Sequence, residues 1–403
     1  MARRVFVHIG TMKSATTYVQ ELYDRNRRVL REAGVLWTSA EANLKAVDQL
    51  LGIHRDRPGL DAAWEELNAA IRGHDDTALI SNELLASLHK PKIERLVEAL
   101  SPAEVHVVIT ARDLARVVPS QWQEGVRNGQ TVAWGDFVAG IRGDEGAEGA
   151  DKEIGRTFWR KHGVAGVVAR WSTYVALDRI TIVTVPPSGS PAALVGERFA
   201  SVLGVDPTTL EQPRSRNPSL GGHSAELLRR VNERCGSFGL LDYKWAFKHA
   251  LARFTLAERA GQEPALVLNA EQQDWARSRA QAMIEAIRGS GVPVVGDLDD
   301  LLPALSGANG AVDPTRATDA EMLDVALDGL VGMGRMLANL RMEYDGLLRD
   351  LEAKLPPSRP GDRQTFAASL DRPEVNHPGI PTKGRFLRWR LANTESTFTG
   401  TPH

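Results

Sequence analysis

A lysine and several hydroxyl residues follow a short apolar run near the start of the chain. The stretch HIGTMKSATTYVQ, residues 8–20, contains Gly10 and Lys13, followed by three hydroxyl residues: Ser14, Thr16 and Thr17. The first turn of a helix has unpaired N–H groups and a partial positive charge, which together favour an anion. Lys13 adds a full charge, the hydroxyls add donors, and Gly10 permits a sharp exit from a strand. The pattern indicates a site for phosphate or sulfate.

This stretch departs from the ATP-binding pattern GxxxxGK[ST]. No glycine precedes Lys13, and Ala15 follows Ser14, so a standard ATP loop is disfavoured. A simpler interpretation is a capped helix with a surface lysine. We favour the anion site, because several donors converge where a parallel sheet would place its ligand.

A second pattern of this kind is VHVVITARDLARVVPSQWQ, residues 105–123. Arg112 follows a strand expected at Val105–Ala111, and Ser120 comes about two helical turns later. The fixed fork of a guanidinium makes paired, charge-assisted bonds to phosphate oxygens. The alternative for Arg112 is an ordinary ion pair with Asp113.

Together the two motifs resemble those of the sulfotransferase family that uses 3′-phosphoadenosine 5′-phosphosulfate (PAPS). The first is similar to that family's loop PKSGTT, with Met12 replacing the proline and Ala15 the glycine. The resemblance implies that Arg112 and Ser120 bind the 3′-phosphate. It also implies a 5′-phosphosulfate loop made of Gly10, Thr11, Lys13, Ser14, Ala15, Thr16 and Thr17. The segment PRSRNPSLGG, residues 213–222, resembles one found in bacterial relatives, which adds Arg216 to the nucleotide site; a basic surface loop is the alternative.

Sulfuryl transfer usually needs a base to take the proton of the acceptor. Glu83 closes TALISNE after a strand expected at Thr77–Ser81, on the same sheet edge as Lys13. The alternative is that Ser81 caps a helix in which Glu83 occupies the first turn. His8 is a further candidate, although a lone histidine in a strand is more often packed and hydrogen-bonded.

The resemblance thus implies a transferase that moves a sulfuryl group from PAPS to a hydroxyl, or less readily an amine. The acceptor would be a small molecule, a carbohydrate or a lipid, and the product 3′-phosphoadenosine 5′-phosphate (PAP); no metal is implied. Two alternatives stay open. One is a nucleotide-dependent kinase, which would need a magnesium-binding acid. The other is a nonenzymatic partner-binding protein with a vestigial phosphate loop.

The elements that must position these residues alternate between strand and helix. Apolar runs predict strands that are separated by helical patterns: Arg4–Ile9, Thr77–Ser81, Val105–Ala111, Arg179–Val185 and a short one within Val292–Pro303. Helices are predicted at Ser14–Ala33, Ala192–Leu203, Ser224–Cys235, Tyr243–Ala260 and Glu271–Ile287. The alternation indicates an α/β fold, a three-layer parallel sheet flanked by helices, which the resemblance identifies as the P-loop-like sulfotransferase fold.

The C-terminal part of the sequence lacks this alternation of strands and helices. We expect a sulfotransferase domain over residues 1–304, a linker over 305–318, a long helix over 319–355 and a disordered or extended tail over 356–403. The helix carries leucine and methionine at helical spacing, which predicts burial without naming the partner. A second copy of the chain and the main domain are equally good partners.

The composition of the chain limits the size of its core, its partners and its compartment. The chain has 403 residues, of which 42% are hydrophobic, so it can form a large core. Its 49 basic and 51 acidic residues give no global charge that would favour nucleic acid. Its 1 cysteine fits a reducing compartment, for which we expect the cytoplasm, and no apolar run reaches the ~20 residues of a membrane span.

Overall fold

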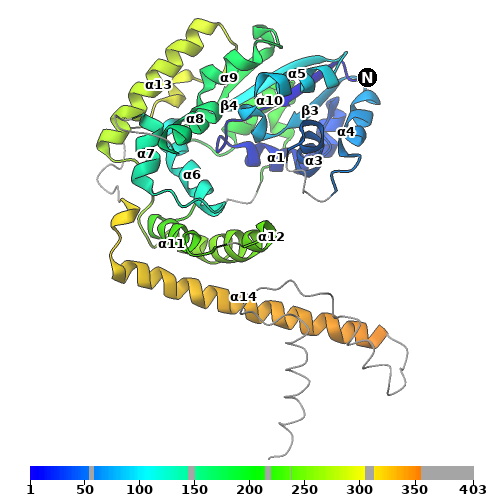
Figure 1. Ribbon diagram of the computed structural model, residues 1–403. Coiled ribbons are helices and arrows are strands. Elements are labelled where there is room, and N and C mark those ends of the chain that lie inside the picture. Colours follow the sequence, from blue (N-terminus) through cyan, green and yellow to red (C-terminus); the bar gives the residue numbers. More distant parts are fainter. Residues whose placement is uncertain (54–58, 144–149, 214–218, 237, 305–312, 355–403) are drawn as a thin grey trace, which may run out of the picture. The chain divides into compact units, whose positions relative to one another are not determined.

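The computed structural model describes residues 1–53, 59–143, 150–213, 219–236, 238–304 and 313–354 (Figure 1). The chain divides into two units, 1–333 and 334–403. The expectations for Arg216 and for the tail over 356–403 concern residues outside this description.

Unit 1 contains a parallel sheet of six strands in the order β2-β3-β1-β4-β5-β6. The strands are β1 Arg4–His8, β2 Val35–Leu36, β3 Thr77–Ser81, β4 Glu104–Ala111, β5 Ile180–Thr184 and β6 Val294–Val295. The predicted α/β class and parallel sheet are therefore confirmed. Only the two-residue β2 lacks a counterpart among the predicted strands, since so short a run has no detectable period.

Helices cover both faces of the sheet (Figure 1). They are α1 Thr16–Arg25, α2 Arg27–Glu32, α3 Ala40–Leu51, α4 Ala63–Arg72, α5 Lys90–Ala99, α6 Leu114–Arg127, α7 Trp134–Arg142, α8 Ala150–His162, α9 Val164–Trp171, α10 Leu194–Leu203, α11 Gly222–Asn232, α12 Leu240–Tyr243, α13 Ala270–Ser290 and α14 Asp319–Lys354. Short helical turns are η1 Glu83–Ser87, η2 Leu177–Arg179, η3 Pro207–Thr209, η5 Leu256–Arg259, η6 Leu298–Leu301 and η8 Pro314–Arg316, and η4 Lys244–Arg253 is a π-helix.

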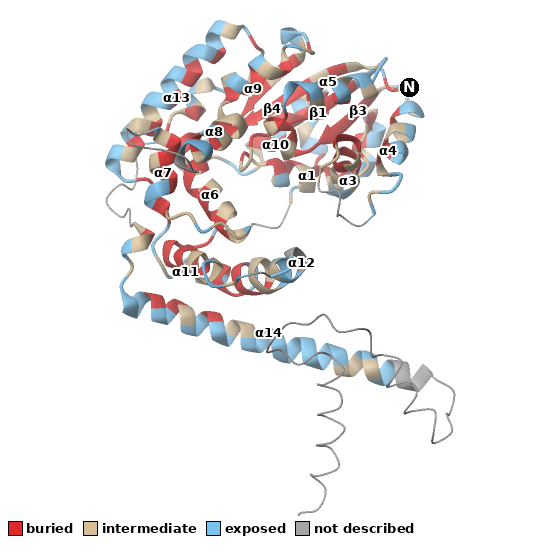
Figure 2. Ribbon diagram, in the orientation of Figure 1, coloured by how far each residue is buried: buried red, intermediate tan, exposed pale blue. Residues whose placement is uncertain are grey.

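The alternation of side chains along the strands builds three layers. Val5 and Val7 of β1 face a core shared with α3, α4, α5, α9 and α13. Phe6, between them, faces a core shared with α1, α2 and α10, as the period of two along a strand requires. A third core, built almost entirely from helices, joins α6, α7, α11 and the start of α14, and Figure 2 shows these buried surfaces within unit 1.

The register aligns the carboxyl ends of the central strands. His8 pairs with Ser81 of β3 and with Val108 of β4. β4 continues to Ala111, so the segment after it begins beyond the segments that follow β1 and β3. The strands that follow β1 along the chain, β2 and β3, lie on one side of it, and the later strands β4, β5 and β6 lie on the other side. The point where the order reverses is a switch point, and ligands bind at such points in open parallel sheets.

One predicted helix is divided in the structure. The sequence predicts continuous helix from Ser14 to Ala33, but α1 ends and α2 begins at Asn26. The Asn26 amide donates to the Leu22 carbonyl at 2.7 Å and to the Glu211 carbonyl at 2.9 Å. It also accepts from the Glu211 N–H at 2.9 Å. This tertiary contact overrides the helical pattern, which reports only local periodicity.

Candidate functional site

The loop after β1 is fixed to β4 by buried hydroxyls. Thr11 donates both its N–H and its hydroxyl to the Thr110 carbonyl, at 3.1 and 3.0 Å. The Ser14 hydroxyl donates to the Thr11 carbonyl and lies 2.8 Å from the Thr110 hydroxyl. Thr11 and Ser14 are almost completely buried. Their side chains therefore hold the loop in place, whereas we expected the Ser14 hydroxyl to face an anion.

Gly10 is required by space in this structure. A Cβ at Gly10 would lie 2.4 Å from the Thr16 hydroxyl and 2.5 Å from the Thr110 hydroxyl, distances that packed atoms do not tolerate. The Thr16 hydroxyl is buried and has no hydrogen-bond partner among the described residues. Thr17, one residue later, is exposed.

Two residues of the loop have a left-handed backbone. Lys13 has φ 67° and Ala15 has φ 68°, and Ala15 is the N-cap of α1. No side chain of the described residues caps α1, and its first turn contains no acidic residue. The first N–H groups of α1 are therefore left for another acceptor, which is the property that suits an anion.

Replacing Ala15 by glycine should stabilise the protein by about 1 kcal/mol, because a left-handed residue with a Cβ is strained by ~1–2 kcal/mol. Part of that gain is offset by the greater freedom of glycine in the unfolded chain. The free energy of unfolding from denaturant titration measures the change. Ala69→Gly, in the exposed interior of α4, is the control and should destabilise. A loss of stability in Ala15→Gly would contradict the strain.

Arg112, at the end of β4, reaches the same loop. Its Nη1 donates to the Lys13 carbonyl at 3.1 Å, so the two predicted motifs meet. Asp113 is the N-cap of α6 and pairs with Arg116, which means that the alternative ion pair of Arg112 with Asp113 does not form. Burial, together with the neighbouring Arg116, lowers the pKa of Arg112 to about 10, although Asp113 opposes the shift. The guanidinium remains charged at neutral pH, and its buried Nε has no partner among the described residues.

One face of α6 continues the site. Ser120 and Glu124 lie one turn apart on this helix, so their side chains project from the same face. The Lys13 ammonium donates to Glu124 Oε2 at 3.2 Å, and Lys248 of η4 donates to Glu124 Oε1 at 3.0 Å. Pro119 lies inside α6 and does not begin it. Ser120 is half-buried.

Glu124 is a carboxylate clamped by two ammonium groups. Burial alone would raise its pKa, but Lys13 and Lys248 outweigh burial and lower the pKa to about 2. Glu124 is therefore charged throughout the physiological range, and it fixes the position of the Lys13 ammonium.

Glu83 shares the charge environment of this cluster. Burial raises its pKa, the charge of Lys13 opposes the rise, and Glu124 adds to it. Asn82, whose side chain accepts from the Leu84 N–H at 2.9 Å, is the cap of η1. The expected cap at Ser81 is thus wrong by one residue, although Glu83 does occupy the first turn of η1, as that alternative required.

His8 lies beneath the loop and is fully buried. Its Nδ1 lies 2.9 Å from the Ser81 hydroxyl and its Nε2 lies 3.1 Å from the Thr110 hydroxyl. Burial lowers the pKa of His8 to about 3. A neutral imidazole with both nitrogens occupied can order the strand ends, but it is badly placed to take a proton from an acceptor.

Sequence reasoning missed Glu124 and Lys248. The position of Glu124, one turn beyond Ser120 on the same helix face, is a signal that could have identified it. Lys248 has no such signal, since it comes from a π-helix in a segment predicted as ordinary helix, Tyr243–Ala260. Only the packing of η4 against α6 brings it to the site.

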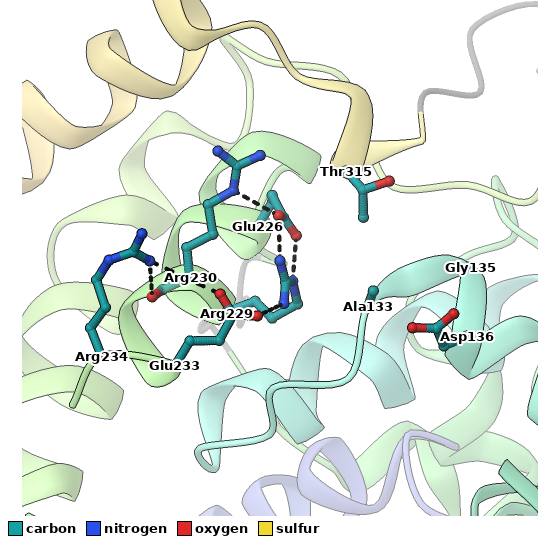
Figure 3. A pocket seen from close by; sticks show the side chains of 9 residues that line it. All are labelled: Ala133, Gly135, Asp136, Glu226, Arg229, Arg230, Glu233, Arg234 and Thr315. Atoms are coloured by element: carbon teal, nitrogen blue, oxygen red, sulfur yellow. Dashed lines mark hydrogen bonds and ion pairs between the residues drawn. The ribbon is translucent and has the colours of Figure 1, made fainter. Parts of the chain in front are cut away.

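A separate hollow of about 500 Å³ contains none of these residues. Figure 3 shows its lining, including Arg229 and Arg230, which both donate to the buried carboxylate of Glu226. The full lining is Ala133, Gly135, Asp136, Glu226, Arg229, Arg230, Glu233, Arg234 and Thr315. Its three arginines are equal in number to its three acids, and Glu226 and Glu233 pair with the arginines, so the lining carries no excess charge for a ligand.

The described part of the chain has no cluster of three or more histidine, cysteine or acidic residues with metal-binding geometry. None of the described helices is both long and apolar enough to span a membrane.

Comparison with known proteins gives limited similarity. No protein-family model and no curated protein matches the sequence. Among solved structures, the chain is similar to the crystal structure of a sulfotransferase from Alicyclobacillus acidocaldarius, with a TM-score of 0.38 and 14% sequence identity. The similarity covers 54% of this chain and 87% of that chain. At this level it carries no inference about activity.

Proposed function

We propose that the protein is a sulfotransferase that moves a sulfuryl group from PAPS to an acceptor hydroxyl, or less readily to an amine. The observation that carries the proposal is the bond from the Arg112 guanidinium to the Lys13 carbonyl at 3.1 Å. It joins two cationic segments at the switch point of the sheet, as a nucleotide with phosphate groups at both its 3′ and 5′ positions would require.

The chemistry of the donor groups fits such a nucleotide. The first turn of α1, which no described side chain caps, and the Thr16 hydroxyl, which has no described partner, suit the 5′-phosphosulfate. The Arg112 guanidinium, with a buried Nε that lacks a described partner, suits the 3′-phosphate together with Ser120. Thr11 and Ser14 act through the backbone position that they fix, and Thr17 is exposed enough to donate directly.

PAPS supplies an activated sulfuryl group when bound. Lys13 stabilises the negative charge that develops on the oxygen between phosphorus and sulfur as the bond between this oxygen and sulfur breaks. Glu83 takes the proton from the acceptor hydroxyl as the acceptor oxygen bonds to sulfur. Glu124 holds the Lys13 ammonium, and Lys248 holds Glu124, so both are positioning residues. The acceptor is a small molecule, a carbohydrate or a lipid, and the cytoplasm remains our expectation for the location.

The test is transfer of labelled sulfate from PAPS to a panel of phenols, sugars and lipids. ATP with magnesium, supplied to the same panel, tests the kinase alternative. Sulfated product with PAP release is expected. Phosphorylated product, or heat of binding for ATP but none for PAP, would overturn the proposal.

Replacing Arg112 by alanine should weaken PAP binding by roughly 10- to 100-fold, because a hydrogen bond to a charged group contributes ~1.5–3 kcal/mol. Arg112→Lys keeps the charge without the fork and should lie in between. Titration calorimetry with PAP measures both. Arg28→Ala, on the exposed surface of α2, is the control, and equal losses in it would contradict a specific role for Arg112.

A further inference from the structure

Helix α14 carries a regular apolar stripe. Apolar residues recur alternately three and four positions apart along it: Leu323, Ala326, Leu330, Met333, Leu337, Leu340, Tyr344 and Leu347. We call these eight residues the heptad seam. A mean period of 3.5 residues is that of the a and d positions of a coiled coil, and it is distinct from the 3.6-residue period of a straight helix.

The large side chains of the heptad seam are exposed, apart from Met333, which is half-buried. Tyr344 is 42% exposed and Leu330 70%, and the other four leucines lie between these values. Figure 2 shows exposed surface along most of α14, and its buried positions gather near the start of the helix. An apolar stripe of this length on a helix surface marks an interaction site.

The first part of α14 packs within unit 1 through a different face of the helix. Met322 and Val325 are buried there. A Cβ at Gly332 would lie 2.1 Å from the Thr255 Cγ2 atom, so the helix start packs closely on that residue. Arg259 donates to Asp324 at 2.7 Å. The start of the helix is thus held mainly through residues outside the heptad seam, and Met333 is the seam residue that packs against this core.

We propose that the heptad seam binds the heptad seam of a second copy of this chain. A two-fold interface requires the same patch on both subunits, and a continuous a/d stripe is complementary to itself. Burial of roughly 60–120 Å² for each large side chain on two helices gives on the order of 1,000 Å², the size at which specific interfaces begin.

The chain's own C-terminal segment is a weaker occupant. Residues 355–403 are interrupted by prolines, among them Pro356, Pro360, Pro373 and Pro381. Their sequence contains no apolar heptad run to match the seam. The proposal does not depend on the sulfotransferase activity, so the two can fail separately.

Sedimentation velocity of the full chain tests the proposal, across a concentration range up to about 50 μM. A dimer is expected for the unmodified protein. Leu337→Lys/Leu340→Lys should be monomeric, with a dissociation constant raised at least ~100-fold, because two charges would enter the apolar interface of each helix. The matched control is Ala338→Lys/Met342→Lys, which adds the same charges at exposed positions outside the seam and should remain dimeric.

Leu337→Ala/Leu340→Ala removes the apolar surface while retaining helix propensity, and it should weaken the dimer in the same direction without added charge. Circular dichroism verifies that helix content is kept. The proposal is overturned by a monomeric unmodified protein, which is also the result expected if the C-terminal segment covers the seam. It is equally overturned if the control pair dissociates as far as the seam pair.

Discussion

Replacing Lys13 by alanine should lower the turnover of sulfuryl transfer by roughly 10²-fold or more, because a preorganised charge donor at the leaving oxygen is lost. The ammonium is fixed by Glu124 at 3.2 Å, so it needs little reordering when charge develops. Turnover under saturating PAPS and acceptor measures the effect. Lys13→Arg, which keeps the positive charge on a side chain of different shape, should retain only part of the turnover.

Two comparisons separate this role from a loss of folding. Lys45→Ala, which removes a surface ion pair with Glu41, should leave turnover unchanged. Lys13→Ala should unfold at nearly the temperature of the unmodified protein, since Glu124 keeps its bond to Lys248. Near-normal turnover in Lys13→Ala would remove Lys13 from the reaction.

Replacing Glu83 by glutamine should lower kcat by roughly 10²- to 10⁴-fold, the contribution typical of a positioned base. The amide keeps the shape of the side chain but cannot accept the acceptor's proton. The measurement is kcat with a hydroxyl acceptor, and Glu94→Gln on the exposed side of α5 is the matched control. Full activity in Glu83→Gln would reassign the base.

The pH profile gives an independent check of Glu83. Burial raises its pKa above the ordinary value of 4.5, and a base acts only when deprotonated. The logarithm of kcat/KM should therefore fall with decreasing pH, starting above pH 4.5, and reach a plateau at higher pH. Glu124 does not titrate in this range, because its pKa is about 2. In Glu83→Gln this acid limb should be absent, and its persistence would point to another group.

Local sequence determined the elements and the two cationic motifs of this protein. The strand bounds at Thr77–Ser81 agree with the prediction, and those of β1, β4 and β5 differ by one residue at one or both ends, because β-branched runs bounded by turns report strands directly. The short strand expected within Val292–Pro303 is only Val294–Val295. Lys13 and Arg112 could be chosen because each follows such a strand, and parallel strands place their carboxyl ends on one edge. The long helix was also evident, since its period extends over many turns.

Tertiary structure alone decided how those residues are used. The Ser14 hydroxyl binds the loop and β4 because its side chain is turned inward, a direction that composition cannot show. Lys248 reaches Glu124 across more than a hundred residues of chain, and such pairs depend on how helices pack. The protonation states of these side chains also depend on this packing, because a pKa is set by burial and by neighbouring charges in three dimensions. Periodicity along the chain records only which side of each element is apolar.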